Sequence, residues 1–170
     1  MRRLGIRLLL SATLIPVFGD AGSAQQVTSE PLRGGNENPP VISEGSGNFR
    51  VQIQNGSFRL RYDVASEEND ITQAHLHIGN PGTNGGIVVF LCTNEGNTPA
   101  GATVRECPAS PGDVTGEILE TDVLAVDDII EAGDLEGLER LARQGAVYAN
   151  VHTDDHPAGE VRGQLSARRR

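Results

Sequence analysis

The sequence predicts a mainly β domain, arranged as a sandwich or a barrel, with one or two short helices. Glycine accounts for 21 of the 170 residues, and aromatic residues make up only 4% of the chain. The apolar residues fall in short runs in which they alternate with polar ones. Many short alternating runs, separated by turn-forming residues, are typical of antiparallel sheets.

The clearest element is a hairpin in the segment NFRVQIQNGSFRLRYDV, residues 48–64. Apolar and polar residues alternate on both sides of Asn55-Gly56, so each arm presents one apolar face. Asn-Gly readily adopts the positive φ angles that a two-residue type I′ turn requires. The apolar face is expected to contain Phe49, Val51 and Ile53 on the first arm and Phe58, Leu60, Tyr62 and Val64 on the second.

A further strand is expected over ITQAHLHI, residues 71–78, followed by a turn-rich loop at 80–86. The apolar run at 87–91 suits a buried strand, and residues 114–120 suit another short one. In the strand at 71–78, alternation assigns the apolar residues to one face and the polar residues to the other. The first face would hold Thr72, Ala74, Leu76 and Ile78, and the second Gln73, His75 and His77.

Residues 122–144 change in character and predict the helical part of the domain. The stretch from Asp127 to Ile130 is expected to begin a helical turn. Asp134 is a plausible N-cap for a short helix, and Gly145 is a plausible residue to end it. The apolar stripe of that helix would consist of Leu135, Leu138, Leu141 and Ala142.

Two closing strands are expected at residues 146–153 and 159–167, separated by a turn. Alternation places Tyr148, Asn150 and His152 on one face of the first strand. In the second strand it places Glu160, Arg162 and Gln164 on one face.

The first 24 residues have the pattern of a secretory signal peptide. Three arginines precede the short apolar core LLLSATLIPVF, and Gly-Ser-Ala supplies small residues for cleavage after Ala24. The apolar run is far shorter than the roughly 20 residues that cross a bilayer, so we expect no transmembrane segment in the mature chain. The expected domains are the signal peptide 1–24, one β domain at 25–166 and a basic tail at 167–170.

Composition and cysteine content both fit an exported protein, either extracellular or periplasmic. The formal net charge is −9, and an acidic surface argues against nucleic acid as a partner. Cys92 and Cys107 are expected to form a disulfide in that compartment. The bridge would close a loop of about 16 residues and stabilise the fold by roughly 3 kcal/mol.

Three segments, in order, resemble the CHRD domain, a module first described in the extracellular protein chordin. They are LRGGNENPPVISEGSG at 32–47, AHLHIGNPGTNGGIVVFL at 74–91 and GAVYANVHTDDHPAGEVRGQL at 145–165. The resemblance covers nearly the whole mature chain and implies an extracellular, immunoglobulin-like β-sandwich or barrel. It implies little about activity. The loop between the two cysteines is longer and more polar than the resemblance leads us to expect.

The four histidines lie in two compact clusters and are candidate metal ligands. On a strand, His75 and His77 would project from the same face, close enough for both rings to reach one ion. His152 would be a third ligand if its strand lies beside residues 75–77, and His156 a fourth. Imidazoles suit copper or zinc better than calcium. Asp154 and Asp155 are additional candidates, as ligands or as acceptors for an imidazole N–H.

A structural interpretation competes with the metal site. Strand histidines can hydrogen-bond through both ring nitrogens and fix the loops around them. The polar residues near the last turn would then form a network that organises one end of the sandwich. Its expected members besides the histidines are Asn150, Thr153, Glu160, Arg162 and Gln164.

The sequence favours a non-catalytic binding module whose ligand is a metal ion or an extracellular protein. No Gly-x-Ser-x-Gly elbow is present, and no Cys–His arrangement suggests a nucleophile. The alternative is a small copper-dependent oxidoreductase resembling a superoxide dismutase. The motif AHLHIG resembles the His-x-His strand of those enzymes, although four histidines suffice only for a copper site without zinc.

Overall fold

In the computed structural model, two layers of antiparallel strands pack face to face, and residues 25–54, 57–65 and 71–167 are described. The expected signal peptide, the Asn55-Gly56 turn and Arg168–Arg170 lie outside these residues. The strands are β1 (Gln25–Ser29), β2 (Leu32–Arg33), β3 (Ser46–Gln54), β4 (Ser57–Ala65), β5 (Ile71–Ile78), β6 (Ile87–Thr93), β7 (Gly112–Ile118), β8 (Val147–Thr153) and β9 (Val161–Ala167). One α-helix, α1 (Leu135–Arg143), and two short 3-10 helices, Gly34–Asn36 and Glu120–Asp122, complete the described elements.

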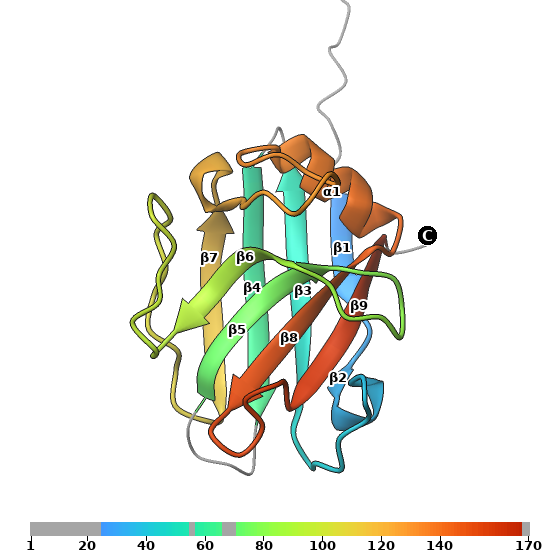
Figure 1. The fold of residues 1–170 in the computed structure, drawn as a ribbon, viewed down its shortest axis with the longest axis vertical. Helices are drawn as coiled ribbons and strands as arrows, with labels where there is room; N and C mark the ends of the chain where they lie inside the picture. The colour runs from blue at the N-terminus through green and yellow to red at the C-terminus, as the bar shows by residue number, and fades with distance from the viewer. Residues whose placement is uncertain (1–24, 55–56, 66–70, 168–170) are drawn as a thin grey trace, which may run out of the picture.

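The strand order β6-β5-β8-β9-β1-β3-β4-β7 divides into two crossing layers (Figure 1). The first layer contains β6, β5, β8 and β9, and the second contains β1, β3, β4 and β7. Pairing of β9 with β1 joins the layers along one edge, and β2 pairs with both β3 and β9 beside that edge. The predicted mainly β fold is therefore confirmed and is consistent with a sandwich.

The β3–β4 hairpin has the predicted register, with Gln54 opposite Ser57 and Phe49 opposite Tyr62. Its alternation is also as predicted, because the apolar side chains are buried while Arg50 and Gln52 are exposed. The buried side chains pack against the inner face of the other layer and form one continuous core. A period of two residues thus decides which face of this hairpin meets the core.

Helix α1 closes one end of the core (Figure 1). The Asp134 side chain accepts a hydrogen bond from the Gly137 N–H at 2.7 Å, as expected of an N-cap. Gly145 follows the helix with φ of 79°, a left-handed conformation that favours glycine at this position. Leu138 and Ala142 are buried against side chains from both layers, so the predicted amphipathic helix is confirmed.

The prediction of a helical turn at residues 127–130 is wrong. Residues 127–129 form a tight turn, and Val126 pairs with Ile130 across it. Asp127 has φ of 42°, which reverses the chain at this point and does not continue into a right-handed helix.

Among the described residues, no helix has the length and apolar character that crossing a bilayer requires.

Candidate metal centre

The first layer is buried on both of its faces, and this places polar side chains in the interior. All seven residues of β8 are buried, as are the last five of β5. Their inner faces meet the core. Over their outer faces runs the loop at residues 79–86, which Arg162, Tyr148 and His77 bind through hydrogen bonds. The outer face of β5 and β8 is therefore a second, polar interior.

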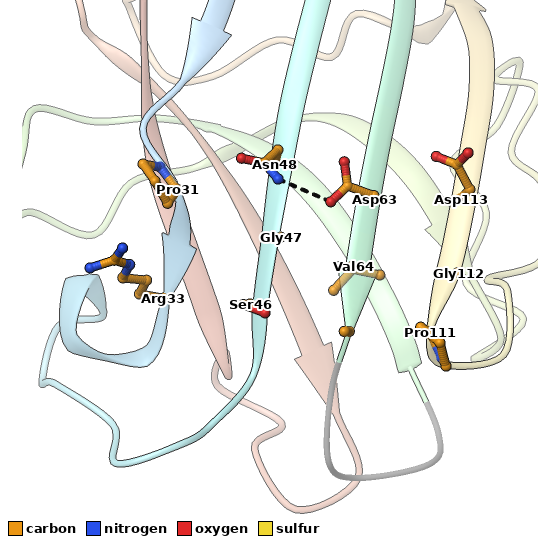
Figure 2. Close-up of a pocket in the computed structure, with 11 residues that line it drawn as sticks. Pro31, Arg33, Ser46, Gly47, Asn48, Asp63, Val64, Pro111, Gly112 and Asp113 are labelled. Atoms are coloured by element: carbon orange, nitrogen blue, oxygen red, sulfur yellow. Dashed lines mark hydrogen bonds between the residues drawn. The ribbon is translucent and has the colours of Figure 1, made fainter.

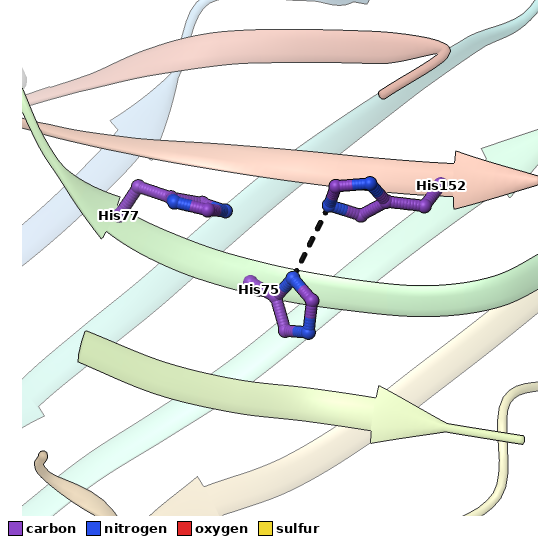
Figure 3. A group of neighbouring side chains, drawn as sticks. All are labelled: His75, His77 and His152. Carbon is purple, nitrogen blue, oxygen red and sulfur yellow. Dashed lines mark hydrogen bonds between the residues drawn. The ribbon is translucent and has the colours of Figure 1, made fainter. Parts of the chain in front are cut away.

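Three histidines meet on this covered face (Figure 3). Strands β5 and β8 are neighbours, with Gln73 opposite His152 and His75 opposite Asn150. The ring centroids lie 5.5 Å apart for His75 and His77, 5.0 Å for His75 and His152, and 6.3 Å for His77 and His152. One ring nitrogen from each residue can be chosen so that all three lie within 4.8 Å of one another. We call His75, His77 and His152 the histidine triad.

Backbone carbonyls hold two of the three rings from behind. His77 Nδ1 lies 3.0 Å from the Gly85 carbonyl oxygen, and His152 Nδ1 lies 3.0 Å from that of Pro157. Because a carbonyl oxygen only accepts, each Nδ1 carries the proton and each Nε2 keeps its lone pair. Rings that ligate metals typically have their other N–H bound to a backbone carbonyl or a carboxylate in this way.

The third ring, that of His75, contacts the ring of His152, and buried ring nitrogens remain available to a ligand. His75 Nδ1 lies 3.2 Å from His152 Nε2, so one proton is shared between this pair. The Nε2 atoms of His75 and His77 are buried and have no hydrogen-bond partner among the described residues. Burying an unsatisfied polar atom costs about 1–3 kcal/mol. His77 Nε2 points toward His152, whereas His75 turns Nδ1 toward His152 and Nε2 away from it, so an ion between the rings would take His77 Nε2, His152 Nε2 and, with the shared proton moved to His75 Nε2, His75 Nδ1.

Burial keeps the triad neutral. The exposed fractions of His75, His77 and His152 are 2%, 8% and 9%. Loss of hydration lowers the pKa of His75 to about 3, with the other two rings adding repulsion. It lowers the pKa of His77 to about 4 and also lowers that of His152, although the Gly85 and Pro157 carbonyls oppose these two shifts. Neutral imidazole is the form that binds metals.

The spacing of the three nitrogens fits one ion after a small contraction. Two imidazole nitrogens bound to one ion at about 2.0–2.1 Å lie about 3.3–3.6 Å apart. The largest separation in the triad exceeds this by about 1 Å, a distance that side-chain rotation can remove. Aromatic rings frame the site, because Phe90 contacts His75 edge to face with centroids 4.4 Å apart and Tyr148 stacks on His77 at 4.9 Å.

Arg162 anchors the polar interior beside the triad. Its guanidinium donates to the backbone carbonyls of Asn36 at 2.5 Å and Thr83 at 3.1 Å, and to Asn84 Oδ1 at 3.1 Å. It also lies 4.8 Å from the centre of the Tyr148 ring and 3.8 Å from the Glu37 carboxylate. Arg162 thus ties the covering loop to the sheet that carries the histidines.

Other residues that the sequence analysis assigned to a structural network lie around Arg162. Asn150 donates to Glu37 Oε1 at 2.6 Å, and Gln164 donates to the Gly79 and Gly145 carbonyls. Glu160 accepts from the Ser43 hydroxyl at 2.5 Å. Thr153 is the exception, because its hydroxyl is buried without a hydrogen-bond partner among the described residues. Both interpretations of the histidines therefore have residues in place, the network beside the triad and the metal ligands within it.

The remaining candidate ligands lie outside the triad. His156 is in the turn after β8, where its backbone N–H donates to the Thr153 carbonyl at 3.2 Å. Asp154 and Asp155 are exposed in the same turn. Within the described residues, the group suited to hold a metal contains the triad and none of these three.

Sequence reasoning missed the residues that cover and orient the triad. Glu37 gives no signal in NENPP, because nothing local shows that its carboxyl reaches Asn150. Gly85 could have been suspected, because the turn-rich loop follows the histidine strand directly. A Cβ on Gly85 would lie 1.6 Å from the Ile78 carbonyl oxygen, so glycine is required for its carbonyl to approach His77.

The burial of Glu37 has an electrostatic consequence. Desolvation raises the pKa of its carboxyl to about 7, while Arg162 and the Asn150 amide oppose that rise. At neutral pH the carboxylate therefore offsets the charge of Arg162 only in part.

The predicted disulfide between Cys92 and Cys107 is present. It joins the end of β6 to the loop that precedes β7. A disulfide is compatible with an extracellular location.

A groove of about 440 Å³ lies on the second layer, away from the triad (Figure 2). Three of its polar side chains are paired, because Asn48 donates to Asp63 at 3.0 Å and Asp113 forms an ion pair with the exposed Arg61. Arg33 and Pro31 line the opposite side. None of the buried polar side-chain atoms that lack a partner among the described residues lines this groove, which makes it the weaker candidate site.

Comparison with known families identifies the chain's relationship. The family model described as CHRD domain matches residues 28–165. Searches of curated proteins and of solved structures return no significant match to the chain.

Proposed function

The chain belongs to the CHRD domain family, and we propose that it is an exported, non-catalytic binding module. Its ligand is a transition-metal ion, bound through His75, His77 and His152. The observation that carries the proposal is the convergence of one ring nitrogen from each histidine within 4.8 Å, with His77 Nε2 buried and without a partner among the described residues. The orientation of His77 and His152 by backbone carbonyls supports it.

The donor set indicates the class of ion. Three neutral imidazole nitrogens suit zinc or copper, whereas calcium and magnesium require oxygen ligands. Burial of the ligands favours tight retention of the ion over rapid exchange with solvent. An oxidoreductase, in contrast, needs an open coordination position for its substrate, so the deep burial of the triad favours binding over catalysis.

Export is part of the proposal and rests on two features. The disulfide Cys92–Cys107 is the state expected in an oxidising compartment. The N-terminal 24 residues have the pattern of a cleaved signal peptide.

Equilibrium dialysis of the untagged mature domain against Zn²⁺ or copper, followed by elemental analysis, tests the proposal. We expect one ion per chain in the wild type and less than about one tenth of that in His77→Gln at the same free metal. His156→Gln, which lies outside the triad, is the matched control and should bind like the wild type.

Folded protein that takes up neither metal would refute the proposal and leave the histidines a structural role. Equal loss of binding in His77→Gln and His156→Gln would also contradict the assignment of ligands. Circular dichroism of each variant establishes that it is folded before binding is compared.

A further inference from the structure

Resting on the proposed function, we infer that the triad selects monovalent copper, Cu(I), and holds it in a three-coordinate site without water. The three features that lead to this inference are the number of donors, the charge around them and the apolar rings that enclose them.

The number of donors disfavours zinc. Structural zinc sites have four protein ligands, and sites with three protein ligands keep a water molecule in the fourth position. Within the described residues the metal-competent group has three members. Asp154 and Asp155, the nearest carboxylates in sequence, are exposed.

The surroundings leave little for a fourth, water ligand to bind. A buried water needs two to four polar partners. Phe90 lies against His75, and the Tyr148 ring lies parallel to His77 with an interplanar angle of 5°. The Tyr148 hydroxyl contacts the covering loop, where it accepts from the Gly85 N–H at 3.2 Å.

The local charge disfavours a divalent ion. Arg162 is 4% exposed, and its guanidinium lies 4.8 Å from the centre of the Tyr148 ring that stacks on His77, which brings a positive charge close to the triad. The three ligands are neutral, so none of them compensates the charge of the ion. The cost of burying an ion grows with the square of its charge, which makes a doubly charged ion about four times as costly as a singly charged one.

The geometry separates the two oxidation states of copper. Cu(II) favours a square-planar or tetragonal set of donors. Three rings from two adjacent strands, with Phe90 and Tyr148 against two of them, provide no such plane of four donors. Cu(I) has a filled d shell, imposes no such plane, and accepts three nitrogens.

The test is a competition under anaerobic conditions. Cu(I) supplied as its coloured bicinchoninate complex is titrated with the untagged mature domain, and transfer of the metal is followed by the loss of colour. Zn²⁺ affinity is measured in parallel with a coloured zinc chelator, and Cu²⁺ binding in air by electron paramagnetic resonance. X-ray absorption spectroscopy of the copper-loaded protein reports the number of donors.

We expect one Cu(I) per chain, three nitrogen donors, and an affinity for Cu(I) at least roughly 100-fold higher than for Zn²⁺. Both His77→Gln and His75→Gln should lose Cu(I) binding by a similar factor, whereas His156→Gln should not. Zinc binding at the triad as tight as that of Cu(I), or Cu²⁺ with four donors, would overturn this inference and leave the proposed function standing. Binding of no metal at all would overturn both.

Discussion

The outer faces of the two layers differ sharply. In β4 and in residues 47–53 of β3, buried and exposed residues alternate, and the outward side chains, such as Arg50, lie in water. In β5 and β8 of the first layer, the outward side chains of the histidine triad are buried, and Gly85 of the loop at 79–86, Phe90 and Pro157 each contact one of the three rings. One layer therefore has one interior face, and the other layer has two.

This difference shows which of the two outer faces lowers the stability of the folded domain. An exposed polar face costs nothing to hydrate, whereas a covered polar face must replace each lost water contact with a protein contact. Asn150 makes such contacts, as does Arg162 through Nε and Nη1, but Arg162 Nη2 and the Nε2 atoms of His75 and His77 have none among the described residues. A covered face with unsatisfied ring nitrogens is what a ligand site requires.

The largest effect is expected in the second layer, from Phe49→Ala. Phe49 is 1% exposed and packs on Tyr62 with ring centroids 6.2 Å apart. Its truncation should lower the free energy of unfolding by about 3–5 kcal/mol, measured by urea denaturation. The adjacent Arg50→Ala, on the exposed face, should change that free energy by less than about 0.5 kcal/mol. Similar losses from both substitutions would mean that this face is covered after all.

The next effect is expected from Arg162→Ala on the covered face. Removing the guanidinium leaves the Asn36 and Thr83 carbonyls without their donor and should cost about 2–3 kcal/mol. Hydrogen exchange should accelerate in residues 79–86 but not in β3 or β4. The control is Arg61→Ala, which should cost far less, because solvent screens its exposed pair with Asp113. Equal costs for the two arginines would contradict the comparison.

A smaller effect is expected from acid in the metal-free protein. The folded-state pKa of each triad histidine lies below its unfolded value of about 6.5, so the unfolded chain takes up protons first as the pH falls. Each histidine then lowers the free energy of unfolding by about 1.4 kcal/mol per pH unit, down to about pH 4 for His77. Glu37, with its pKa raised to about 7, acts in the opposite direction between pH 7 and 4.5 and cancels one histidine.

The His77→Gln variant isolates this effect. Its free energy of unfolding, measured in urea with a chelator present, should fall less steeply between pH 6 and 4.5 than that of the wild type, by roughly 1.4 kcal/mol per pH unit. Gln73→Ala, which changes a residue without a titrating group on the same strand face, should keep the wild-type slope. An unchanged slope in His77→Gln would show that this ring is already protonated or exposed in the folded protein.

The parts of the fold that depend on local pattern could be predicted from the sequence. Alternation located β3, β4 and β5, and Asp134 and Gly145 marked the ends of α1. The spacing of His75 and His77 placed both rings on one strand face, because the side chains of a strand alternate with a period of two. In the sequence analysis, His152 was a third ligand only on the condition that its strand lies beside residues 75–77. The pairing of β5 with β8 meets this condition.

The covering of the triad could not be predicted, because it depends on contacts between distant residues. Glu37 and Asn150 are separated by 113 positions, and Arg162 and Thr83 by 79. No local pattern encodes such contacts. The prediction of a helical turn at residues 127–130 was wrong for a different reason. Asp127 adopts a positive φ, and tertiary packing decides this conformation of a single residue.

The most direct test of the central claim is the location of the metal itself. Crystals of the metal-loaded domain, measured at the absorption edge of the bound metal, should give one anomalous peak about 2.0–2.1 Å from a ring nitrogen of each of His75, His77 and His152. A peak elsewhere, such as at His156 and Asp154, or no peak in fully loaded crystals, would contradict the claim.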